Sequence, residues 1–371
     1  MAGVGVGMGM VGSRVIAIHH RHHRTLIPTP QFNLHFNLPS IHSHRPSIMS
    51  ATAATPSTAV NNPVLQQNTA STDSTSGCWP EFASNISGEW DGYGADFTID
   101  GHPIELPENV VPDAYREWEV KVFDWQTQCP TLAQPENPSA IYKLIKLLPT
   151  VGCEADAATR FNVDERTIGG PTNMVSAFAY QSSGSYTALW STQKAGVLEL
   201  EHCLIDPRDK ESRVRIVQIM GFEEKSKLVL KNIKVFVEQW YGPFRNGDQL
   251  GGCAIRDSAF ATTKALDVSQ VLGMWQCVNS KAYFQDSPNS VLQELKPVDG
   301  VEKSVRDKEH LVLLPKNLWS SIKETEDGEK TWCEVGWLLE SGRVITSKCI
   351  FSRNGELKEI ITSSETTEVG V

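Results

Sequence analysis

The sequence predicts a mainly β protein built from two tandem antiparallel β-barrels with few short helices. Three observations predict this class. After residue 80 the dominant hydrophobic period is two, as in half-buried strands. Turn signals recur at hairpin spacing between the alternating segments. A Gly-x-Trp opening occurs twice, as Gly88 to Trp90 and as Gly273 to Trp275.

Four segments predict strands by alternation. In each, apolar side chains occupy one face and polar or charged side chains the other, so each strand is expected to be half buried. We expect basic side chains such as Arg213 and Arg215 to lie on solvated strand faces. Asn354-Gly355 provides the strongest hairpin signal in the chain. The predicted strands are residues 116–125, 212–220, 232–240 and 344–351.

Helical signals are few. Residues 139–148 place Ile141, Leu144, Ile145 and Leu148 at helical spacing, and residues 290–296 predict a short helix. The charge-rich stretch 299–308 predicts an exposed loop. Many short strands with little helix favour a barrel or sandwich, and barrel closure removes exposed strand edges.

The first 72 residues differ in kind from the rest. They contain no Asp, Glu or Lys, their only permanent cations are four arginines, and they are rich in Ser, Thr, Ala and Pro. This composition is typical of an organelle transit peptide. Prolines interrupt any amphipathic presequence helix, which favours the chloroplast over the mitochondrion. We therefore expect a disordered chloroplast transit peptide and leader over residues 1–72, and a protein of the stroma or the thylakoid surface.

Composition excludes some function classes. The formal net charge of −10 does not suit nucleic-acid binding, which needs clustered Lys and Arg. No apolar run approaches the roughly 20 residues that span a bilayer, so no transmembrane segment is expected. The eight cysteines form no CxxC pair, and no metal site is predicted.

The repeated opening has a simple physical interpretation. A glycine lets the chain enter the first strand without a Cβ clash, and a tryptophan two residues later faces the same side and can plug the narrow end of a barrel. A brief helix- or turn-forming segment precedes each copy. We therefore expect Trp90 and Trp275 to be core plugs.

On these residues the chain resembles the calycins, the lipocalin-like superfamily of up-and-down barrels, and a plant and cyanobacterial family with two such barrels. The resemblance implies an arginine packed over each tryptophan. Arg213 or Arg215 is the candidate in the first barrel, and Arg343 or Arg353 in the second. The expected boundaries are a first barrel over 79–250, a linker over 251–265, a second barrel over 266–363 and a frayed tail over 364–371.

No nucleophile elbow, phosphate loop or dinucleotide fingerprint occurs, which favours binding over catalysis. The resemblance implies a hydrophobic ligand, such as a tetrapyrrole, carotenoid or lipid, held in a barrel by a non-catalytic carrier or chaperone. One alternative is an assembly or scaffold factor for a thylakoid protein complex, and another is a barrel-type isomerase or cyclase. The candidate ligand-binding residues at the barrel ends or mouths are Trp90, Tyr93, Arg215, Trp275 and Arg353.

Overall fold

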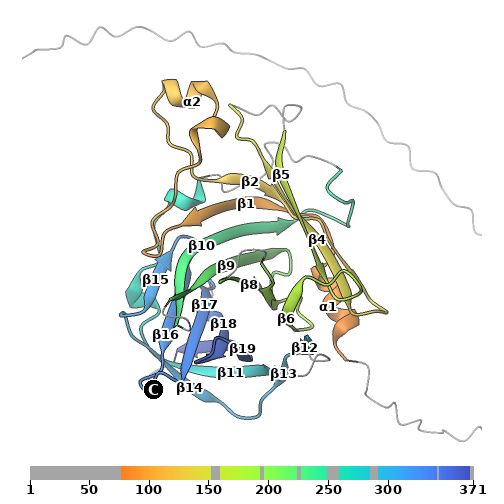
Figure 1. Ribbon diagram of the computed structural model, residues 1–371, viewed down its shortest axis with the longest axis vertical. Coiled ribbons are helices and arrows are strands. Elements are labelled where there is room, and N and C mark those ends of the chain that lie inside the picture. Colours follow the sequence, from red (N-terminus) through yellow and green to blue (C-terminus); the bar gives the residue numbers. More distant parts are fainter. Residues whose placement is uncertain are drawn as a thin grey trace, which may run out of the picture. The chain divides into compact units, whose positions relative to one another are not determined.

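The structure is a computed structural model. It describes residues 77–151, 159–192, 196–223, 227–248, 259–284, 291–340 and 342–367. The chain divides into two units, Met1–Thr69 and Ala70–Val371, and every described residue belongs to the second. The predicted transit peptide over residues 1–72 therefore lies outside the described residues. Within them the protein is mainly β, as predicted, and two curled antiparallel sheets carry almost all of the regular structure (Figure 1).

The first sheet contains eleven strands in the order β12-β6-β7-β8-β9-β10-β1-β2-β4-β3, and β5 pairs with β4. Strand β1 returns beside β10, with Trp90 opposite Trp240 and Phe97 opposite Ile233, and this pairing curls the meander into a barrel. One strand comes from the C-terminal part of the chain, since β12 pairs in parallel with β6. The strands are β1 (Trp90–Phe97), β2 (Trp125–Gln128), β3 (Thr131–Gln134), β4 (Ser139–Leu147), β5 (Arg160–Ile168), β6 (Val175–Tyr180), β7 (Tyr186–Trp190), β8 (Val197–Ile205), β9 (Ser212–Glu223), β10 (Lys227–Trp240) and β12 (Leu292–Glu294).

The second sheet repeats this scheme with eight strands in the order β13-β11-β19-β18-β17-β16-β15, and β14 pairs with β11. Here the last strand, β19, returns beside the first, β11. Strand β19 continues into the segment expected to be a frayed tail, because Glu365 is buried inside the barrel. The strands are β11 (Gly273–Tyr283), β13 (Lys296–Pro297), β14 (Glu302–Arg306), β15 (Leu311–Leu314), β16 (Leu318–Glu324), β17 (Lys330–Leu338), β18 (Arg343–Ser352) and β19 (Leu357–Thr367).

A short helical segment precedes each Gly-x-Trp, as predicted. Helix α1 (Trp79–Ile86) places Trp79, Phe82 and Ile86 in an aromatic cluster that fills one end of the first barrel. In the second barrel the corresponding segment is the short helix η4 (Val268–Gln270). In the described part of the chain, no helix has the length and apolar character needed to cross a membrane.

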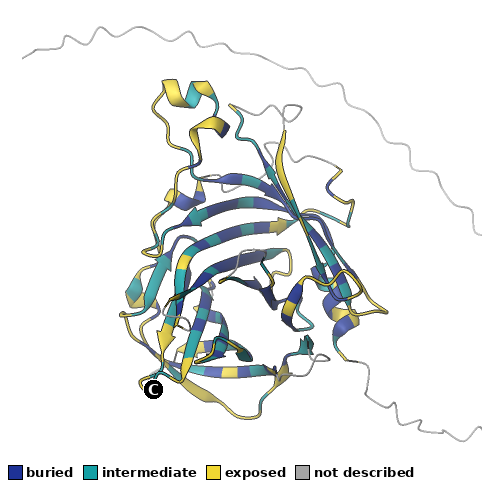
Figure 2. Ribbon diagram, viewed as in Figure 1, coloured by how far each residue is buried: buried dark blue, intermediate teal, exposed yellow. Residues whose placement is uncertain are grey.

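The two barrels pack through the outer faces of their sheets. One shared cluster joins Leu200 and Met220 of the first sheet to Cys349 and Phe351 of the second. A second shared cluster lies around Ile216 and includes the short helix η3 (Phe260–Thr262) from the expected linker. Figure 2 shows buried residues concentrated on the strands of both sheets.

Polar side chains also cross this layer. Gln218 Nε2 donates to Ser320 Oγ at 2.8 Å, and His202 Nδ1 lies 2.8 Å from Ser347 Oγ. Both His202 and Gln218 are fully buried. The apolar stripes predicted for β9 and β10 therefore face the neighbouring barrel, and the charged stripes face inward.

Two segments predicted as helices are strands. Residues 139–148 form β4, because the ladders with β2, β3 and β5 outweigh the helical spacing of the apolar residues. In residues 290–296, the described part forms β12 and the start of β13. Pairing with distant strands determined the secondary structure of both segments, and the local spacing of apolar residues does not reveal such pairing.

The strand predicted over residues 116–125 is also wrong in its first part. The chain forms helix α2 (Asp113–Glu117) after Pro112, and Glu119 then adopts a left-handed conformation with φ 55°. Trp118 is 61% exposed instead of facing a core. Strand β2 begins only at Trp125, and Figure 2 shows the α2 region as largely exposed.

Candidate ligand site in the first barrel

The two Gly-x-Trp motifs have the same geometry. The indole N–H of Trp90 donates to Ile86 O at 2.8 Å, and that of Trp275 donates to Val271 O at 3.0 Å. Both acceptors lie four residues upstream, at the end of the preceding helical segment. Both tryptophans are buried, so the prediction that they are core plugs is confirmed.

An arginine covers each ring. The Arg213 guanidinium lies 4.2 Å from the Trp90 ring centroid, so Arg213 is the partner of Trp90. In the second barrel Arg306 lies between two rings, 5.7 Å from that of Trp275 and 5.0 Å from that of Trp319. The expectation of Arg343 or Arg353 is wrong, because β18 and its turn direct Arg343 to Ser364 and Arg353 to the exposed Glu329.

The predicted solvated position of Arg213 and Arg215 is also wrong. Both side chains are 1% exposed and face the interior of the first barrel. Arg215 bonds Glu238 through Nε and Nη2, both at 2.8 Å, and Glu201 through Nη1 at 2.9 Å. Every nitrogen of this guanidinium therefore has a carboxylate partner, as a buried cation requires.

Glu201 is the centre of this charge network. Its carboxylate accepts hydrogen bonds from Tyr142 Oη at 2.6 Å, Tyr186 Oη at 2.8 Å and Trp190 Nε1 at 2.7 Å, besides Arg215. Burial acts to raise the pKa of Glu201, but Arg215 and these donors outweigh it and hold the pKa at about 2. The carboxylate is therefore ionised at neutral pH and fixed in place.

A cavity of about 240 Å³ lies beside this network, between β4, β5, β8, β9 and β10. Its apolar lining includes Leu144, Val163, Val217 and Phe236. Among its cations, Arg166 is neutralised by Asp164 at 2.9 Å and Glu199 at 2.7 Å.

Two lysines in the cavity wall, unlike Arg166, form no direct ion pair in the part of the chain that the structure describes. Within the described residues, neither Lys146 nor Lys234 has an ion-pair or hydrogen-bond partner. Burial lowers the pKa of Lys146; the charges of Asp96 and Asp164 oppose that shift, and the positive charge of Lys234 adds to it. An anionic group bound between them would offset both effects.

An aromatic pair adjoins these lysines. Phe161 stacks on Trp125 with centroids 4.9 Å apart and an interplanar angle of 16°, and the Lys146 ammonium lies 5.1 Å from the Trp125 centroid. Phe161 is 48% exposed although it is aromatic. A flat, partly exposed π surface therefore lies beside the lysine-bearing wall, although neither ring lines the cavity itself.

The structure separates the predicted site residues. Arg215 lines the cavity, whereas Trp90 closes the barrel near Arg213. Tyr93 packs on the outer face of the first sheet, Trp275 belongs to the second barrel, and Arg353 is exposed at a hairpin. Whether any of the five binds a ligand stays a prediction.

Sequence reasoning missed Lys146 and Lys234. Lys234 was placed on the charged face of its strand, but that face was expected to meet solvent. Lys146 lay in the segment predicted as a helix. Their alternation with Leu147 and Val235 is the signal that could have placed them on inward faces, once the outward faces were known to be covered.

No family model matches the chain, and no curated protein matches it. Among solved structures, a protein of unknown function from the DUF3598 family of Nostoc punctiforme is similar over 78% of this chain and 98% of its own, with 13% identity and a TM-score of 0.46. An S-type phycobiliprotein lyase from Guillardia theta is similar over 43% of this chain and 91% of its own, with 10% identity and a TM-score of 0.26. At these identities and scores the similarities carry no argument about function.

Proposed function

We propose that the first barrel binds an amphipathic small molecule with an apolar body and at least one carboxylate, and that the protein is a non-catalytic carrier or chaperone for it. The observation that carries this proposal is the pair Lys146 and Lys234, two cations that form no direct ion pair within the described residues, in a wall whose arginines are paired with carboxylates. Both lysines are partly buried, so an ammonium without a direct ion pair carries a desolvation cost that a ligand carboxylate would offset.

The charges of the cavity wall favour some of the three expected ligand classes, tetrapyrrole, carotenoid and lipid, over others. A carotenoid offers no carboxylate, so it would leave both lysines unpaired. A tetrapyrrole with two carboxylates, or a fatty acid with one, would pair with them. The Phe161 and Trp125 stack favours a flat conjugated body, and so a tetrapyrrole.

The size of the cavity bears on how such a ligand would lie. Its volume of about 240 Å³ is below the roughly 300–1,000 Å³ of pockets that enclose a drug-sized ligand. A tetrapyrrole would therefore insert its carboxylate side chains and leave part of its ring system against the exposed Phe161.

The charge network argues against the isomerase or cyclase alternative. A general acid or base works best with a pKa near the operating pH. Glu201 has a pKa of about 2, and burial raises the pKa of Tyr142 well above its ordinary value. Both groups keep one protonation state across the physiological range, so we assign them to holding the barrel wall.

The test is a titration of the full chain with biliverdin, protoporphyrin, palmitate or β-carotene, in which tryptophan fluorescence reports binding. We expect saturable binding of one of the three carboxylate ligands and none of β-carotene. The double variant Lys146→Gln/Lys234→Gln should weaken binding by roughly tenfold to a hundredfold, from the loss of charge-assisted hydrogen bonds.

Lys143→Gln is the matched control. Lys143 lies on the same strand as Lys146, bonds Asn246 and faces away from the cavity, so this variant should bind as the native chain does. Absence of saturable binding by any carboxylate ligand would refute the proposal. Co-purification of protein partners in stoichiometric amounts, with no bound ligand, would favour the alternative of a thylakoid assembly factor.

Residence in the chloroplast is part of this proposal. It rests on the acid-free, Arg-bearing, hydroxyl-rich leader over residues 1–72. Import of the full chain into isolated chloroplasts, with removal of the leader, is the expected outcome. A chain that stays outside the organelle at full length would refute this part alone.

A further inference from the structure

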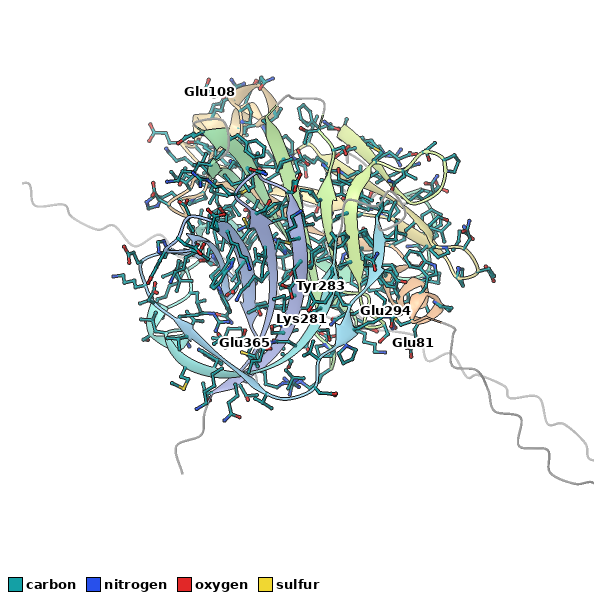
Figure 3. The ribbon with its side chains drawn as sticks, turned by 60° about the horizontal axis from the view of Figure 1, so that its bottom comes forward. Glu81, Glu108, Lys281, Tyr283, Glu294 and Glu365 are labelled. Atoms are coloured by element: carbon teal, nitrogen blue, oxygen red, sulfur yellow. The ribbon has the colours of Figure 1, made fainter. Side chains whose placement is uncertain are left out.

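The second barrel contains a cavity of its own. Its volume is about 270 Å³, and its wall comes from β11, β14, β15, β16, β17, β18 and β19. Figure 3 shows Glu365 on β19 and Lys281 on the neighbouring strand β11. Among the described residues, none from the first barrel contributes to this wall.

Two buried N–H donors in this wall have no partner within the described residues. One is Nη1 of Arg306, a side chain that is 5% exposed. Its Nη2 bonds Glu365 and its Nε bonds Glu334 at 3.3 Å, so two of its three nitrogens are occupied. The other donor is Nε1 of Trp332. A buried donor left without an acceptor costs free energy, so such groups usually have a hydrogen-bond partner, whether from the protein, water or a ligand.

The charges of the wall are already balanced. Four Lys or Arg and four Asp or Glu side chains line the cavity. The central ones pair directly, with Lys348 Nζ 3.0 Å from Glu334 and Arg306 between Glu334 and Glu365. Unlike the first barrel, this cavity has no pair of free lysines, so a charged guest would add an uncompensated buried charge.

We propose that the second barrel is a separate binding site for a small uncharged molecule whose carbonyl oxygen accepts hydrogen bonds from Arg306 and Trp332. The volume corresponds to about nine waters at roughly 30 Å³ each, so a guest of one ring with a polar substituent would fill it. The site differs from that of the first barrel in ligand charge and size.

Benzamide and benzoate are matched probes, since they have the same shape and differ in charge. We expect benzamide to shift the indole N–H resonance of Trp332 saturably in the ¹⁵N-labelled full chain, and to leave that of Trp337 unchanged. Trp337 lies on the same strand β17 but packs on the outer face, outside this cavity.

Calorimetry then measures the part played by the indole donor. Trp332→Phe keeps the ring and removes the N–H, and it should weaken benzamide binding roughly threefold to tenfold. Trp337→Phe should leave the affinity unchanged. Benzoate binding as tightly as benzamide would overturn the uncharged ligand class. No saturable shift from either probe, or equal affinity in native protein and Trp332→Phe, would overturn the site itself.

Discussion

The interiors of the two barrels differ although their entrances are alike. Each begins with a glycine, a buried tryptophan and an arginine over the indole ring. In the first barrel the central guanidinium of Arg215 is fully paired and the free charges are two lysines in the cavity wall. In the second barrel the lysines are paired or exposed, whereas, among the described residues, Arg306 keeps an unpartnered N–H as its counterpart Arg213 does in the first barrel. The comparison teaches that the buried tryptophan and its arginine are common to both barrel ends. The side chains farther inside each barrel differ, and they determine which ligand each cavity would accept.

The largest expected difference concerns the central carboxylates. Glu201→Leu should lower the free energy of unfolding by about 3–5 kcal/mol, because it leaves Arg215 Nη1 and three buried neutral donors without an acceptor, although Arg215 retains Glu238. Glu365→Gln in the second barrel should cost at least about 1 kcal/mol less, because Glu365 serves fewer donors, Arg306 and Thr346, and an amide oxygen can still accept from them. Urea unfolding monitored by circular dichroism measures both values.

Glu199→Gln is the control for the first barrel. Its side chain is 21% exposed, and its partner Arg166 retains Asp164, so the loss should stay below about 1 kcal/mol. Equal losses for Glu201→Leu and Glu365→Gln would show that the two interiors do not differ as described.

The layer between the barrels predicts a pH dependence. Burial lowers the pKa of His202 to about 4 in the folded protein, from an ordinary value of 6.5. Protonation therefore favours the unfolded chain. The stability contribution is complete above pH 6.5 and is lost as the pH falls toward 4, by at most about 3 kcal/mol.

Unfolding of the native chain and of His202→Gln at pH 7.5, 5.5 and 4.5 isolates this effect. The difference between the two proteins should change by about 1–3 kcal/mol over this range, with the native chain losing more. Using the difference removes the opposite contribution of Asp91 and Asp124, whose pKa values burial raises to about 6. A constant difference would contradict the buried neutral state of His202.

The duplicated glycines give a smaller contrast. Gly88 has φ +144°, and a Cβ there would lie 2.1 Å from Trp240 Nε1, whereas Gly273 has φ +104° and open space around it. Gly88→Ala should therefore cost about 2–3 kcal/mol and Gly273→Ala about 1 kcal/mol in thermal unfolding. An equal or larger cost at Gly273 would contradict this difference between the two glycine sites.

The sequence was sufficient for the fold class and for the plugs. Period-two alternation and the repeated Gly-x-Trp predicted antiparallel barrels, since these signals depend only on local side-chain direction. It was insufficient for β4, whose three strand ladders override a helical pattern. The strand predicted through Trp118 was wrong for the opposite reason, because its alternating segment has no neighbouring strand to pair with.

The candidate site was less predictable. Alternation shows that Arg215 and Val214 occupy opposite faces of a strand, but it cannot show which face is inside. Here the apolar face is covered by the other barrel, and the charged face becomes the interior. Arg306 was missed because its strand was expected to be an exposed charged loop. Long-range pairing, which one sequence does not display, determined both outcomes.

The central claim is that Lys146 and Lys234 hold a ligand carboxylate in the first barrel. Its most direct test compares the affinities of biliverdin and biliverdin dimethyl ester for the native chain and for Lys146→Gln/Lys234→Gln. We predict that the native chain prefers the free acid by roughly tenfold or more, and that the preference falls to about one in the double variant. An equal affinity of the native chain for acid and ester, or an undiminished preference in the double variant, would contradict the claim.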